Sequence, residues 1–173
     1  MTIAELLADA FGRVHATVHE AVDGLTPGQL AFRPDSGANS IGWLIWHLTR
    51  IQDDHIADVA GTAQLWTAAD GGPSWADRFG LPFAASATGY GHGTEAVAAV
   101  QVTSGELLTG YYDAVHEATL RYLRGLTGPD LDRVVDKAWD PPVTLGVRLV
   151  SVINDDLQHA GQAAYLRGIV ERS

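Results

Sequence analysis

The chain has 173 residues, 46% apolar and 18% charged, which is ordinary for one globular domain spanning residues 1–173. The formal net charge of −10 and the single lysine, Lys137, argue against nucleic acids and anionic membrane surfaces as partners, because both require basic patches. The chain has no cysteine, so disulfides and thiolate ligands are excluded and any bound metal must take nitrogen and oxygen ligands.

Four segments have apolar residues at the spacing of amphipathic helices, and polar N-cap residues or glycines mark their ends. The predicted helices run from about residue 2 to 23, from the cap Ser40 to near Gly61, from the cap Thr103 or Ser104 to Gly128, and from Thr144 to Val170.

Residues 63–100 lack this periodicity and are rich in glycine and proline, so we expect a long crossover between the second and third helices with one or two short helical turns. Trp66 and Trp75 lie in it, and we expect them to pack, with a roof over a pocket as the alternative. Residues 134–143 predict an irregular or extended connection. Four long helices with one long crossover predict an all-α four-helix bundle, in which sites are built in the core from facing helices.

Asp155 and His159 lie one turn apart on a mostly apolar helical stripe formed by positions 148, 152, 155, 159, 163, 166 and 170. Buried polar groups need partners, because an unpaired one costs roughly 1–3 kcal/mol. His47, on or beside the apolar face of the second helix, can add a third metal ligand. Three ligands leave a coordination position open, as in catalytic zinc sites, and the same set suits nickel or iron. From spacing alone, a hydrogen-bonded core His47 and an Asp155–Arg148 ion pair are the alternative.

His15 and His19 also have the i, i+4 spacing of metal ligands, but Asp23 stands where the H-E-x-x-H motif needs its second histidine. We expect a solvent-facing pair, with His15 as a proton shuttle or a fourth metal ligand as the alternatives. Gln162, one turn beyond His159, is expected at the helix surface, with contact to a bound ligand as the alternative.

Residues 39–48 (NSIGWLIWHL) and 159–168 (HAGQAAYLRG) resemble the two signature blocks of the DinB superfamily, and residues 25–34 also resemble that family. The resemblance implies a four-helix bundle with a divalent metal held by three side chains, which carry over to His47, Asp155 and His159. Many members have histidine at the middle position. The branch of the mycothiol-dependent maleylpyruvate isomerases and related thiol S-transferases has glutamate there, of which Asp155 is a shortened version.

We therefore expect a metal-dependent enzyme acting on a small electrophilic substrate, with zinc as the first choice and nickel or iron as alternatives. The resemblance implies a low-molecular-weight thiol such as mycothiol, and transferase or isomerase activity, with a hydrolase as a further option. Beyond a metal-bound water or thiol and the possible role of His15, no catalytic group is assigned. The alternative is a non-catalytic, metal-bound, stress-related binding protein.

The N-terminus lacks the basic and apolar regions of a signal peptide, and no apolar run reaches the roughly 20 residues of a membrane span, so we expect a cytoplasmic protein. The apolar and aromatic faces of the helices also lead us to expect a homodimer.

Overall fold

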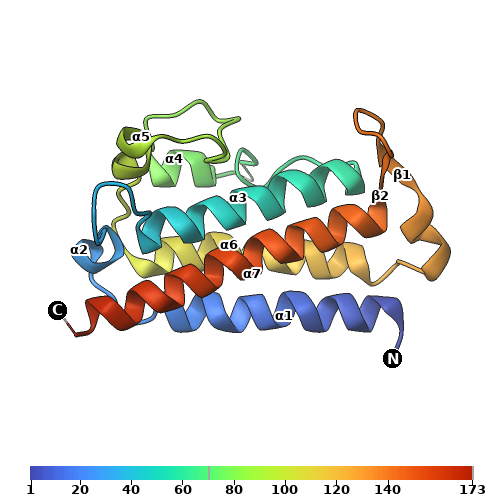
Figure 1. The fold of residues 1–173 in the computed structure, drawn as a ribbon. Helices are drawn as coiled ribbons and strands as arrows, with labels where there is room; N and C mark the ends of the chain where they lie inside the picture. The colour runs from blue at the N-terminus through green and yellow to red at the C-terminus, as the bar shows by residue number, and fades with distance from the viewer. Residues whose placement is uncertain (70, 173) are drawn as a thin grey trace.

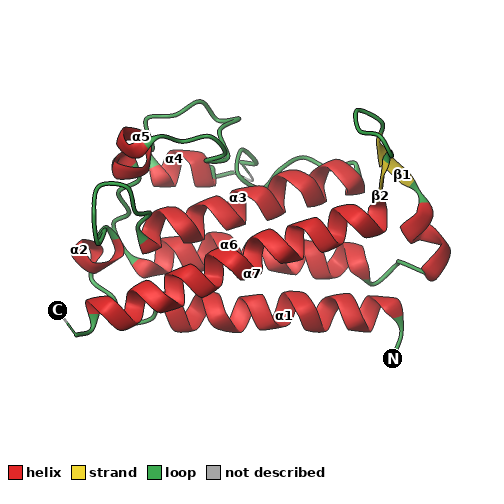
Figure 2. Cartoon of the chain, viewed as in Figure 1, coloured by secondary structure: helices red, strands yellow, loops and turns green. Residues whose placement is uncertain are grey.

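A computed structural model describes residues 1–69 and 71–172. Four long helices lie side by side in it: α1 (Ile3–Val22), α3 (Ile41–Ala60), α6 (Gly105–Leu123) and α7 (Leu145–Val170) (Figure 1). Helices α3 and α1 both pack against α6 and α7, whereas α1 and α3 barely touch, so these two occupy diagonal positions. Helices dominate the chain in Figure 2, which confirms the predicted all-α bundle.

The long helices begin where the sequence places their caps. The side chains of Ser40, Ser104 and Thr144 each accept a hydrogen bond from the backbone N–H three residues later, which satisfies one of the free donors of the first helical turn. Ser104, rather than Thr103, is therefore the cap of α6. Helix α3 ends at Gly61, whose left-handed φ of 67° is open to glycine at little cost.

The crossover between α3 and α6 contains two short helices, α4 (Trp75–Phe79) and α5 (Thr94–Ala99), as expected for residues 63–100. It covers α3 in Figure 1, and the ring of Trp46 on α3 packs against Trp66 and Phe83 of the crossover. Every residue from 41 to 50 is consequently buried, including the charged Arg50. The N-terminal half of α3 is thus enclosed on the bundle side and on the crossover side.

Small elements complete the chain. Helix α2 (Pro27–Leu30) lies between α1 and α3, and the 3-10 helix η1 (Gly128–Asp132) follows α6. Strands β1 (Val134–Asp136) and β2 (Val143–Thr144) then form an antiparallel hairpin where an extended or irregular connection was predicted. Among the described residues, no helix has the length and apolarity required to span a membrane.

Candidate metal centre

His47, Asp155 and His159 meet where α3 packs against α7. One possible ligand atom of each lies within 4.8 Å of those of the other two. The ring centroids of His47 and His159 are 4.8 Å apart, and His159 Nε2 lies 3.7 Å from Asp155 Oδ1. The tertiary structure therefore brings together the three residues that the sequence singled out, and we call them the α3–α7 site.

Hydrogen bonds determine which ring nitrogen of each histidine is free. His47 Nδ1 lies 2.6 Å from the backbone carbonyl oxygen of Thr88, which can only accept, so Nδ1 carries the proton. His159 Nδ1 lies 2.9 Å from Gln162 Oε1, which also accepts. Both rings are left with an Nε2 lone pair. A histidine that donates its other N–H to a carbonyl or carboxylate oxygen is typical of metal ligands.

Asp155 shows the second feature that a metal would explain. Its Oδ2 is buried but has no hydrogen-bond partner among the described residues. The 3.7 Å from Oδ1 to His159 Nε2 is too long for a hydrogen bond. A buried oxygen without a partner costs about 1–3 kcal/mol, and more when it is charged. A divalent cation would satisfy it, so the three residues fit a metal.

The surroundings of His47 keep its ring neutral and fixed. Burial lowers the pKa of His47 and the nearby His159 lowers it further, while the Thr88 carbonyl and Asp155 act in the opposite direction. A neutral ring is what metal binding requires. The ring stacks on Trp43 at a centroid distance of 4.6 Å. His47 is only 5% exposed, but the side chains of His159 and Asp155 are 18% and 35% exposed, so the site can be reached from solvent.

Arg148 does not pair with Asp155, which was the alternative from the sequence. Its Nη2 lies 3.1 Å from Asp136 Oδ2, and its Nη1 lies 2.9 Å from His55 Nδ1. Asp136 belongs to β1, so the hairpin before α7 turns Arg148 away from the α3–α7 site.

Asp156 is a buried polar residue that was not predicted from the sequence. The buried face of α7 includes four positions of the predicted stripe, 152, 163, 166 and 170, but it also takes in Leu149, Asp156 and Ala160, so Asp155 and His159 lie at its border. Burial raises the pKa of Asp156 well above its ordinary value, with a smaller contribution from Asp155. The helical period of residues 149, 152, 156, 160 and 163 was the signal that could have found it.

His15 does not join the α3–α7 site, because α1 lies diagonally across the bundle from α3. His15 Nε2 and His19 Nε2 instead lie 2.8 Å and 2.7 Å from Asp113 Oδ1 on α6. The two histidines are partly buried rather than the solvent-facing pair expected from the sequence. Next to them, burial and His15 lower the pKa of His116 to about 4.

Comparison with known proteins bears on the family and the fold of the chain. The family model described as the DinB superfamily matches residues 10–163, a range that includes all three residues of the α3–α7 site. A conserved protein from Enterococcus faecalis, known from a crystal structure, is 32% identical and superposes with a TM-score of 0.90, covering 100% of this chain and 99% of its own. No curated protein gives a significant match.

Proposed function

The chain belongs to the DinB superfamily, and we propose that it is a divalent-metal protein in which His47, Asp155 and His159 hold the ion. The observation that carries the proposal is the orientation of the two rings, whose Nδ1–H groups point at Thr88 O and Gln162 Oε1 and leave Nε2 free. Two neutral imidazoles and one carboxylate favour zinc, with nickel or iron as alternatives.

The proposal extends to a metal-dependent enzyme that acts on a small electrophilic substrate with the help of a low-molecular-weight thiol of the mycothiol type. As a transferase it would join the thiol to the substrate, and as an isomerase it would use the thiol to rearrange the substrate. When bound, the metal supplies a Lewis acid that lowers the pKa of a thiol or water. A chain without cysteine needs such a thiol from outside. The partial exposure of Asp155 and His159 supports this version, because a small molecule can reach them.

His92 is the chain's own candidate for moving a proton at this site. It lies on the crossover, close enough to His47 to lower the pKa of that residue. His92 Nδ1 accepts a hydrogen bond of 3.3 Å from Trp43 Nε1, and the His47 ring stacks on the same Trp43. This role replaces the one considered for His15, which lies across the bundle. A fourth ligand from His15 would have supported the non-catalytic alternative.

Metal analysis tests the metal proposal. Untagged protein is purified without chelator and its metal content is measured by plasma mass spectrometry, next to His159→Ala and Asp155→Ala. We expect each variant to hold one equivalent less than the wild type, and His55→Ala, outside the site, to hold as much as the wild type. A folded but metal-free wild type, or site variants that keep all their metal, would overturn the proposal.

The thiol proposal needs a separate measurement. Cobalt(II) is loaded in place of the native metal, and mycothiol, glutathione and a thiol-free analogue are added in turn. A new charge-transfer band with a thiol, absent with the analogue and absent in His159→Ala, supports thiol binding at the α3–α7 site. Unchanged spectra with every thiol contradict it. The homodimer and the cytoplasmic location stay predictions.

A further inference from the structure

A second group of imidazole and carboxylate side chains lies where α1 packs against α6, across the bundle from the α3–α7 site. We propose that His15, His19 and Asp113, the α1–α6 cluster, bind a second divalent transition-metal ion, independently of the first site. One possible ligand atom of each of the three lies within 4.8 Å of those of the other two.

The cluster is assembled from one helix face and one facing carboxylate. The i, i+4 spacing puts both histidine rings on the same face of α1, with centroids 4.5 Å apart. Their Nε2 atoms lie 2.8 Å and 2.7 Å from one atom, Asp113 Oδ1. Two imidazole nitrogens that converge on a carboxylate form a donor set that suits zinc or nickel. Both Nε2–H groups donate to this oxygen, so an ion would replace their protons at the point where the three side chains converge.

A third imidazole next to the cluster is a separate sign that a ligand belongs there. The ring of His116 lies 4.6 Å from that of His15, and the residue is only 9% exposed. His116 Nδ1 is buried and has no hydrogen-bond partner among the described residues. Buried polar atoms in folded proteins nearly always have a partner, so an unpaired nitrogen at this position calls for one. His116 does not belong to the group of ligand atoms that could share one ion, so this nitrogen marks an unfilled polar position beside the cluster and is not counted as a ligand.

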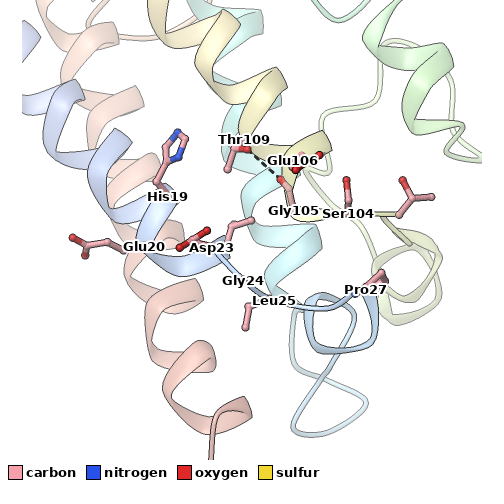
Figure 3. A pocket seen from close by; sticks show the side chains of 12 residues that line it. His19, Glu20, Asp23, Gly24, Leu25, Pro27, Ser104, Gly105, Glu106 and Thr109 are labelled. Atoms are coloured by element: carbon pink, nitrogen blue, oxygen red, sulfur yellow. Dashed lines mark hydrogen bonds between the residues drawn. The ribbon is translucent and has the colours of Figure 1, made fainter.

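Of the three residues of the cluster, His19 also lines a cavity of about 800 Å³ at the end of α1, whereas His15 and Asp113 do not line it. In Figure 3, His19, Glu20 and Asp23 from the end of α1 stand on one side of this cavity, and Glu106 of α6 stands on the other. The lining residues include three carboxylates and no lysine or arginine. Arg167 of α7 is nearby, but its Nη1 donates to the backbone carbonyls of Glu20 and Asp23.

The position on α1 also favours a cation. His19 lies in the last turn of α1, where the helix dipole carries a partial negative charge that Arg167 offsets in part by donating to the Glu20 carbonyl. The three carboxylates of the cavity outnumber Arg167, which favours a cation over an anion. The partial exposure of His15, His19 and Asp113 leaves a path for the ion.

Counting metal equivalents in the full-length chain tests this inference. Metal-depleted protein is dialysed against zinc, its bound metal is measured, and cobalt(II) spectra report the coordination. We expect two equivalents in the wild type and one in each of His19→Ala, Asp113→Asn and His159→Ala. The double variant His19→Ala with His159→Ala should bind none. His55→Ala, a partly buried histidine outside both clusters, should bind two.

Asp113→Asn keeps the shape of the side chain and guards against a trivial folding defect, which circular dichroism also monitors. If His19→Ala and Asp113→Asn, both folded, bind as much zinc as the wild type, the inference is overturned. It is also overturned if His159→Ala alone binds none. A wild type with a single equivalent that is lost in His19→Ala and kept in His159→Ala would support the α1–α6 site and contradict the proposed function at the α3–α7 site.

Discussion

Gly89 of the crossover lies directly against His47. Replacing it tests whether the crossover positions His47 in the α3–α7 site. A Cβ atom at position 89 would lie 2.7 Å from His47 Nδ1 and 3.0 Å from Trp46 Cζ3. The ring or the loop must then move by about 0.7 Å to reach an ordinary contact. A shift of this size displaces Nδ1 from the Thr88 carbonyl, 2.6 Å away, and so weakens the hydrogen bond that orients the ring.

Loss of the group that orients a metal-binding histidine typically weakens metal binding by about 10- to 100-fold, and we expect this for Gly89→Ala. The backbone at Gly89 has a φ of +94°, so alanine also costs roughly 1–2 kcal/mol of stability there. Gly91→Ala is the matched control, because Gly91 has a φ of +75° but nothing lies within 4 Å of its added Cβ. It shares the backbone cost and lacks the collision.

Competitive zinc titration against a chromophoric chelator, with thermal unfolding of the metal-free proteins in parallel, separates the two effects. Both variants should be destabilised, and only Gly89→Ala should bind zinc more weakly at the α3–α7 site. Equal zinc affinities for Gly89→Ala and Gly91→Ala would refute the conclusion that the crossover positions His47 for a metal.

The remaining predictions concern stability. The pKa of His116 is lowered from 6.5 to about 4, so between these values the residue stays neutral in the folded chain while the unfolded chain takes up a proton. Its contribution to the free energy of unfolding therefore falls as the pH drops from 6.5 towards 4. The free energy of unfolding of the metal-free protein, measured with urea at pH 7 and at pH 4.5, should fall by about 2 kcal/mol less in His116→Gln than in the wild type. An equal fall in both proteins would contradict this. Asp53→Ala should lower the free energy of unfolding by about 3–5 kcal/mol in the same assay, because the fully buried Arg50 loses its carboxylate and the backbone N–H of Trp66 loses its acceptor. A loss below about 1 kcal/mol would be incompatible with a buried ion pair. Thr144→Ala should cost about 1 kcal/mol in thermal unfolding through the lost cap of α7, and no change would mean that the cap contributes nothing.

The bundle could be predicted because the signals for its helices are local. Apolar spacing identifies a helical face within a few turns, and caps such as Ser40 and Thr144 lie next to the turn that they begin. The α3–α7 site was within reach for a related reason. Asp155 and His159 lie on the same helix, so their spacing alone puts them on one face. The apolar spacing around His47 places it on or beside the inner face of another helix, so the site forms once the two helices pack together.

The α1–α6 cluster could not be predicted from the sequence, because Asp113 is separated from His15 and His19 by 98 and 94 residues. Nothing near Asp113 in the sequence distinguishes it from a surface carboxylate. Which helices are neighbours depends on the packing of the whole bundle, and this arrangement brings α6 to α1 while keeping His15 away from His47.

The sequence by itself determined the helices and which residue types are available as metal ligands, because residue types and helical periodicity are properties of the chain. Only the tertiary structure decided which nitrogen of His47 is free, since the proton on Nδ1 is fixed by the carbonyl of Thr88, 41 residues further along. It also decided that Asp156, rather than Asp155, points into the core. Adjacent helix positions differ by about 100° in direction, and the packing of α7 against its neighbours selects between them.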